Sequence, residues 1–174
     1  DITVAAAHFN HRLRGAEADR DQAFVEAWCA DHGIVCETGS ADVAAYTEQS
    51  GMSTEEAARH WRYECLEKCA DELGCTAIAT AHNSDDNAET VLLNLTRGAG
   101  AKGLCGIPPV RGRLIRPLLA TSRARIEDYL AENGVAHISD STNDTDDYTR
   151  NVIRHRVMPV LRGINPEFSA SAMR

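Results

Sequence analysis

The sequence predicts an α/β fold, a parallel twisted sheet with helices on both faces, followed by a mostly helical C-terminal segment. Short apolar runs without polar alternation are typical of buried parallel strands, and residues 2–9 are the first of them. Segments with helical spacing separate these runs, and Gly33 and Gly74 mark the ends of two such segments. Strands and helices that alternate in this way form parallel sheets through right-handed crossovers.

The individual elements follow from local signals in the first 97 residues. Phe24 and Trp28 lie on one face of the first helix, and Ser53 with Glu56 forms a capping-box pattern at the start of a later one. The predicted strands cover residues 2–9, 34–37 and 76–81, and the predicted helices cover residues 16–32, 42–48, 53–73 and 85–97.

The pattern changes after residue 98, where closely spaced glycines predict a flexible loop. Residues 110–116 around Gly112 predict a small hairpin, and Ser122 caps a helix that ends at Gly134. A polar, turn-rich stretch then leads to a last helix over residues 148–158, which we expect to stop before Pro159. We therefore expect two parts, residues 1–119 and a helical extension over residues 120–174.

Composition excludes several classes of protein. No apolar run approaches the length needed to cross a bilayer, and no secretory signal opens the chain, so we expect a cytoplasmic protein with no membrane partner. The six cysteines include no Cys-x-x-Cys pair, and reduced thiols packed as small apolar residues are the favoured interpretation. Because the chain begins with Asp1 and leads directly into a strand, we expect that the natural N-terminus lies upstream.

The charge is unevenly distributed along an acidic chain of net charge −8. Residues 97–126 hold 7 Lys and Arg with no acid, and residues 148–166 hold four arginines with no acid. Solvated surface is the simple explanation, but such segregation favours a face that contacts phosphates. The pattern Gly98 to Gly103 matches a dinucleotide fingerprint, but it follows a predicted helix rather than a strand, so we reject that site.

A polar cluster follows the strand predicted at residues 76–81 and is the strongest candidate site. His82, Asp85, Asp86 and Glu89 crowd a strand-to-helix junction, the edge at which parallel sheets bind ligands. The helix dipole should lower the pKa values of these acids and keep them ionised. Ionised carboxylates there can hold Mg²⁺ or accept a proton from an amine. Acids also favour first helical turns without any function, but the added histidine favours a functional site.

Arginines on two predicted helices complement this cluster. Arg59 and Arg62 lie on one helix, and Arg150 and Arg154 share a face of the last helix with no acid to neutralise them. Arginines stabilise charge that develops on phosphoryl oxygens.

Several motifs occur in a characteristic order along nearly the whole chain. They include Thr80-Ala-His82 with Asp85-Asp86 and Glu89-Thr90, Arg116-Pro-Leu-Leu, and Arg150-Asn-x-x-Arg154-His155; the others are His11-Arg-Leu-Arg14, Glu55-Glu-Ala-Ala-Arg59 with Arg62-Tyr63, Arg97-Gly-Ala-Gly100 and Asp140-Ser-Thr-Asn143. Together they resemble the catalytic domain of the tRNA(Ile)-lysidine synthase family. The single motifs are loose, and the ordered set is specific.

The resemblance implies an N-type ATP pyrophosphatase fold of the adenine nucleotide alpha-hydrolase type. It also implies an ATP-dependent ligase that forms a carbon–nitrogen bond, with isoleucine tRNA, free lysine, ATP and Mg²⁺ as partners; a homodimer is left open. Such enzymes adenylate a wobble cytidine, and lysine then displaces AMP. The expected catalytic residues are His82, Asp85, Asp86, Arg62 and Arg154. Those expected to bind ATP are His11, Arg59 and Arg150, and Asp86 is the expected Mg²⁺ ligand.

One part of the family pattern is missing from the sequence. The first strand and the Ser-Gly-Gly-x-Asp-Ser phosphate loop do not occur in residues 1–174, so we expect these residues alone to be inactive. A tRNA thiolase of the same superfamily is one alternative, although the lack of Cys-x-x-Cys counts against it. A non-catalytic nucleotide- or RNA-binding module is the other.

Overall fold

The computed structural model describes residues 2–10, 15–40, 54–140, 142, 145–146 and 148–173. The chain forms two compact units, residues 1–78 and residues 79–174. The helix expected at residues 42–48 and the N-cap Ser53 lie outside the described residues. The division at residue 119 that the sequence suggests stays a prediction.

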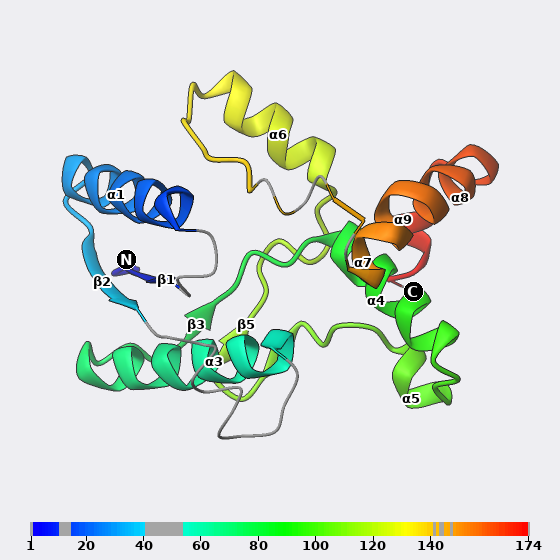
Figure 1. The fold of residues 1–174 in the computed structure, drawn as a ribbon, viewed down its shortest axis with the longest axis horizontal. Helices are drawn as coiled ribbons and strands as arrows, with labels where there is room; N and C mark the ends of the chain where they lie inside the picture. The colour runs from blue at the N-terminus through cyan, green and yellow to red at the C-terminus, as the bar shows by residue number, and fades with distance from the viewer. Residues whose placement is uncertain are drawn as a thin grey trace. The chain divides into compact units, whose positions relative to one another are not determined.

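The first unit is built on a parallel strand pair (Figure 1). Strands β1 (Ala5–Asn10) and β2 (Val35–Ser40) pair in parallel, and helix α1 (Ala16–Asp31) connects them. Helix α3 (Thr54–Glu72) lies on the opposite side of the pair from α1 and packs on β1, where the rings of Phe9 and Trp61 meet edge to face at 5.6 Å. The parallel sheet with helices on both faces is therefore confirmed in this unit.

A second, smaller sheet has the strand order β3-β5-β4. Strand β3 (Ile78–Ala79) is shorter than predicted, and β4 (Val110–Arg111) and β5 (Leu114–Ile115) form the predicted antiparallel hairpin. Gly112 turns the hairpin with φ 60°, a conformation that costs glycine little. The amide of Thr80 donates to the carbonyl of Ile115 at 3.0 Å and so ties the exit of β3 to β5.

The second unit is mainly helical, as expected for the C-terminal segment. Ala88 of α4 packs against Ile153 and Met158 from the end of the chain, and Leu92 and Phe168 border this core. The helices are α4 (Ser84–Thr96), α5 (Ala101–Leu104), α6 (Arg123–Glu132), α7 (Thr149–Val152), α8 (Met158–Ile164) and α9 (Phe168–Ser171). Helix α6 begins at the predicted cap, where the Ser122 hydroxyl accepts from the amide of Arg125.

Two expectations for this unit are wrong. The glycine-rich segment after residue 98 contains the short helix α5, and the helix predicted to stop before Pro159 continues through it. Between α7 and α8 the chain widens into one turn of π-helix (Ile153–Val157), and Pro159 then lies in the first turn of α8. A first helical turn tolerates proline because its missing N–H would have no partner inside the helix.

The glycine-rich segment is anchored to α4 by Asn87, whose side chain is buried. Its Oδ1 accepts from the amide of Ile107 at 2.7 Å, and its Nδ2 donates to the carbonyl of Ala172 at 3.2 Å. Gly106 has φ 67°, and a Cβ there would collide with the Asn87 side chain. Only glycine therefore allows the chain to pass this close to α4.

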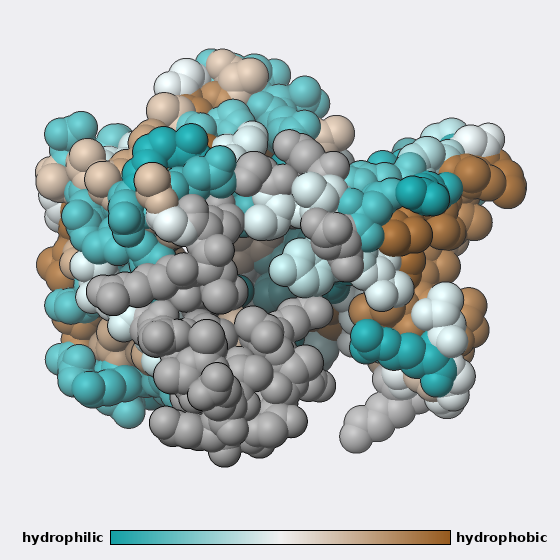
Figure 2. Space-filling model, in the orientation of Figure 1, coloured by the Kyte–Doolittle hydropathy of each residue, from teal (hydrophilic) through white to brown (hydrophobic). Residues whose placement is uncertain are grey.

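The surface is mixed, with apolar side chains gathered over α8 (Figure 2). Val157, Val160 and Ile164 recur at helical spacing and are exposed by 38%, 62% and 79%. Within the described part of the chain, no helix combines the length and apolar character that crossing a membrane requires.

Candidate active site

The N-terminus of α4 carries the acids that the sequence singled out, and its cap holds them in place. Asn83 is the N-cap, and its Oδ1 accepts from the amides of Asp85 at 2.9 Å and Asp86 at 3.0 Å. Asp86 Oδ2 accepts in return from the amide of Asn83 at 3.0 Å, which completes a capping box. The cap role of Asn83 was not predicted, although an Asn three residues before an acid is a recognisable signal.

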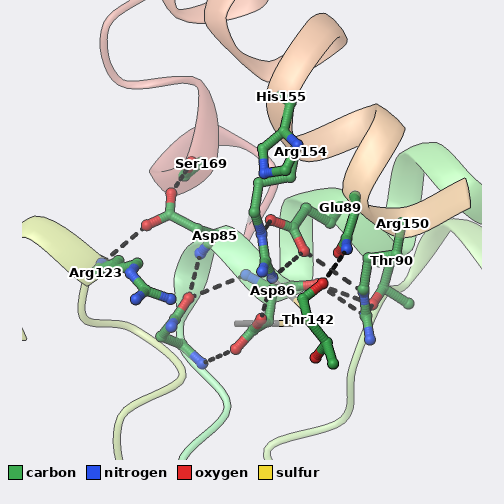
Figure 3. A network of polar contacts seen from close by, with 12 residues as sticks. Asp85, Asp86, Glu89, Thr90, Arg123, Thr142, Arg150, Arg154, His155 and Ser169 are labelled. Atoms are coloured by element: carbon green, nitrogen blue, oxygen red, sulfur yellow. Dashed lines mark hydrogen bonds and ion pairs between the residues drawn. The ribbon is translucent and has the colours of Figure 1, made fainter. Parts of the chain in front are cut away.

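Asp85 is occupied by structural contacts (Figure 3). Its Oδ2 accepts from the amide of Arg123 at 2.8 Å, and its Oδ1 accepts from Arg162 at 2.8 Å and from the Ser169 hydroxyl at 2.5 Å. Because these partners belong to α6, α8 and α9, one carboxylate ties three helices to α4. Asp85 therefore helps to hold these helices together, and its expected catalytic role stays a prediction.

The pKa of Asp85 reflects this position. Burial alone would raise it, but the hydrogen bonds from Ser169 and the Arg123 amide and the charge of Arg162 outweigh burial, so the pKa lies below its ordinary value of 3.8. The direction agrees with the sequence prediction. The partners from three other helices, rather than a helix dipole alone, are the cause.

Replacing Asp85 by asparagine should destabilise the protein at neutral pH by about 1 to 3 kcal/mol. The new side chain has one oxygen and one NH₂ group, so in one orientation the NH₂ faces the Arg123 N–H and in the other it faces Arg162, which then loses its acceptor. A carboxylate with a lowered folded-state pKa stabilises above its unfolded pKa, and this stability is lost as pH falls through the folded pKa. The free energy of unfolding, measured in urea, should therefore be higher for the wild type than for the variant at about pH 7. This difference should shrink below about pH 4. The control is Asp128→Asn, which changes an exposed acid of α6. A difference in free energy of unfolding between wild type and Asp85→Asn that does not vary with pH would contradict the prediction.

Glu89 lies at the centre of the site with a side chain only 2% exposed. Its Oε1 accepts from Arg154 Nε at 2.7 Å, and its Oε2 accepts from Arg154 Nη2 at 2.9 Å, a bidentate pair (Figure 3). Arg150 Nε approaches Glu89 Oε2 at 3.5 Å, and Arg154 Nη2 lies 3.4 Å from Asp86 Oδ1. The hydrogen bond to Glu89 raises the pKa of Arg154, and the charges of Glu89, Asp86 and Asp85 add to this effect against its burial.

The expectation that no acid neutralises Arg150 and Arg154 is wrong. Glu89 and Asp86 of α4 pair with them across more than 60 residues of sequence. Arg150 is held further by the Thr90 hydroxyl, which accepts from its Nη2 at 2.5 Å and donates to the carbonyl of Asp86 at 2.8 Å. The sequence placed Glu89 in the cluster but did not include it among the expected catalytic or ATP-binding residues.

The other predicted site residues are His82, which lies beside α4, and Arg59 and Arg62, which lie on α3. His82 directly precedes the cap of α4, and its Nδ1 lies 3.0 Å from the Thr80 hydroxyl. Arg59 and Arg62 are exposed on α3 of the first unit, where the Arg59 guanidinium lies 5.3 Å from the centre of the Tyr63 ring. His11 lies outside the described residues.

Two further residues of the second unit, Arg162 and Ser169, contact an acid of α4 and were not predicted, and Asn151 ties α7 to the segment before it. Arg162 and Ser169 hold Asp85, and the buried Asn151 donates to the carbonyls of Thr142 and Thr145 at 2.8 and 2.7 Å. Arg162 belongs to a basic segment that the sequence did identify. The sequence offers no comparable local signal for Ser169, because its partner lies 84 residues away.

The acids of α4 do not fit a preformed magnesium site. Asp85 already accepts from Arg162 and Ser169, and Glu89 accepts from Arg154. Asp86 divides its oxygens between the Asn83 amide and Arg154. Among the residues that the structure describes, no group of three or more His, Cys, Asp or Glu is arranged to hold a metal ion. The Mg²⁺ role of Asp86 stays a prediction.

Several known proteins are similar to this chain in sequence. The chain is 42% identical over 172 residues to "tRNA(Ile)-lysidine synthase" of Porphyromonas gingivalis, which covers 98% of the chain and 38% of the relative. The proteins of the same name from Bacillus subtilis and a Thermotoga species are 41% and 43% identical, over 94% and 95% of the chain and 36% and 40% of the relatives. The chain thus spans well under half the length of these curated relatives.

A solved structure supports the fold. The chain superposes on the U34-tRNA thiolase NcsA from Methanococcus maripaludis, a structure that contains a [4Fe-4S] cluster, with a TM-score of 0.77. The match covers 99% of this chain and 60% of the thiolase at 16% identity, so it shows the shared fold alone. The PP-loop domain family matches residues 1–161. With a match over this length and the expected α/β architecture, the chain belongs to the PP-loop domain family.

Proposed function

We propose that this chain is the ATP-using part of a tRNA(Ile)-lysidine synthase. The observation that carries the proposal is the similarity, along nearly the whole chain, to several proteins of that name at 41–43% identity. A PP-loop domain implies the use of ATP. The arginine–carboxylate cluster at the N-terminus of α4 supports a reaction in which charge develops on phosphates.

The proposed reaction has two steps. The C2 oxygen of the wobble cytidine attacks the α-phosphorus of ATP, forms an oxygen–phosphorus bond and releases pyrophosphate. The ε-amine of lysine then attacks C2, forms the carbon–nitrogen bond and expels AMP as the carbon–oxygen bond breaks. The amine must lose a proton for the second step, which a nearby carboxylate or histidine can accept.

Several residues are proposed to share these tasks. Arg154 and Arg150 are 24% and 32% exposed, so their guanidinium groups can reach a phosphate while Glu89 anchors them. Asp86, with a side chain 21% exposed, is the most accessible of the three acids of α4. The resemblance alone supports further proposals: catalytic roles for His82, Asp85 and Arg62, and a role in ATP binding for His11 and Arg59.

A tRNA thiolase is the second candidate, since NcsA shows that this fold also occurs in a tRNA thiolase. Sulfur transfer of that kind needs cysteines that can hold a cluster or carry sulfur. The structure describes all six cysteines, and none of them forms a disulfide or belongs to a Cys-x-x-Cys pair. Burial raises the pKa values of Cys65 and Cys69. A raised pKa disfavours the reactive thiolate, so the lysidine reaction is preferred.

The test uses the protein encoded by the complete gene. Incubated with isoleucine tRNA, ATP and lysine, it should join labelled lysine to the wobble cytidine and release AMP and pyrophosphate. Without lysine, adenylated tRNA should accumulate. Transfer of sulfur instead would favour the thiolase, and tRNA binding without ATP consumption would favour a non-catalytic module.

A further inference from the structure

Two consecutive residues of α4, Glu89 and Thr90, hold Arg154 and Arg150, which come from the C-terminal part of the chain. Glu89 binds Arg154 through two hydrogen bonds of 2.7 and 2.9 Å, and the Thr90 hydroxyl binds Arg150 at 2.5 Å. Arg150 lies on α7, and Arg154 lies on the π-helical turn that follows it. All of these contacts lie within the second unit.

The exposure of each side chain separates the groups that can touch a substrate from those that cannot. Glu89 is 2% exposed, whereas Arg154 and Arg150 are 24% and 32% exposed. The carboxylate is therefore almost closed to solvent, whereas its two arginine partners are partly open to it. Arginine side chains carry much rotamer freedom, and fixing their planes before a substrate arrives lowers the entropy cost of orienting them.

The backbone around Arg154 reinforces this interpretation. A single π-helical turn interrupts the helix at Ile153–Val157 and shifts the register of the residues that follow. Ile153 and Met158, on either side of Arg154, are buried against Ala88 of α4. The turn is thereby fixed to the helix that carries Glu89, so the arginine and its carboxylate partner are held by one rigid core.

We propose that Glu89 and Thr90 are positioning residues, which hold Arg154 and Arg150 in the orientation that the adenylation step requires and do not touch the substrates themselves. The proposal rests on the proposed function for its kinetic part only. Glu89 acts mainly through Arg154, and Thr90 acts through Arg150. The geometric part concerns this chain's own side chains and can be measured without any reaction.

A double-mutant cycle on the complete protein tests the kinetic part. In single-turnover adenylation, Glu89→Gln should slow the reaction by about 30-fold in the wild-type background, and by no more than about threefold in the Arg154→Ala background. Equal losses in both backgrounds would overturn the proposal. A rise confined to the KM for lysine would also overturn it, because Glu89 would then contact lysine directly.

An NMR measurement tests the geometric part without activity. The Nε–H of Arg154, assigned by its absence in Arg154→Ala, should exchange slowly with solvent in the wild type and at least about tenfold faster in Glu89→Gln. Unchanged protection would overturn the proposal. If the wild type forms no adenylated tRNA, the proposed function fails, while this measurement still decides whether Glu89 positions Arg154.

Thr90→Val is a milder change than Glu89→Gln, and we expect this variant to keep the fold. Loss of a buried pair partner can unfold a protein, so the cycle is repeated with Thr90→Val and Arg150→Ala in place of the Glu89 pair. Thr90→Val should slow adenylation about threefold to tenfold, and this loss should vanish in Arg150→Ala. The matched control is Thr96→Val on the same helix, whose exposed hydroxyl donates only to the Leu93 carbonyl and whose loss should leave the rate unchanged. A Thr90→Val rate equal to that of the control would overturn the Thr90 assignment.

Discussion

Replacing Arg154 by alanine should raise the activation free energy for the formation of adenylated tRNA by about 2 to 4 kcal/mol, which slows this step roughly 30- to 1000-fold. The reason is the loss of a charge-assisted contact to the departing pyrophosphate from a guanidinium that Glu89 orients in advance. Single-turnover assays with labelled ATP, tRNA and no lysine measure this step directly.

The control for this change is Arg156→Ala. Arg156 belongs to the same π-helical turn, but its side chain is 70% exposed and pairs with Asp146 rather than with α4. At saturating tRNA its loss should leave the adenylation rate within about twofold of wild type. Equal rate losses in both variants would mean that Arg154 contributes only general positive charge.

Replacing Asp86 by asparagine should slow lysidine formation by about 10²- to 10⁴-fold, and the affected step identifies its role. The variant keeps an oxygen for the Asn83 amide but loses the charge beside Arg154, so we expect slow adenylation.

The same assay separates the alternatives for Asp86. Normal formation and accumulation of adenylated tRNA in the variant would contradict our expectation and make Asp86 the acceptor of the lysine proton. A rise in the Mg²⁺ concentration needed for half-maximal adenylation would support the role as a metal ligand. Wild-type rates for both steps would remove Asp86 from the catalytic residues.

Local signals predicted the helices well wherever their stabilisation is local. Helix α6 begins at the Ser122 cap and ends just before Gly134, and α1 ends just before Gly33, because capping and left-handed glycine conformations act within one turn. The hairpin at Gly112 was predicted for the same reason. The continuation of the last helix past Pro159 was not, because the burial of Met158 in the core outweighs the local stop signal.

The sequence alone determined the α/β class, the resemblance in ordered motifs and the location of the candidate site at the start of α4. The tertiary structure decided how the acids divide their roles. Asp85 meets Ser169 across 84 residues and Glu89 meets Arg154 across 65, so no spacing in the sequence marks either pair. Periodicity and caps report on neighbours within a turn or two, whereas the charge that an acid faces depends on how distant helices pack around it.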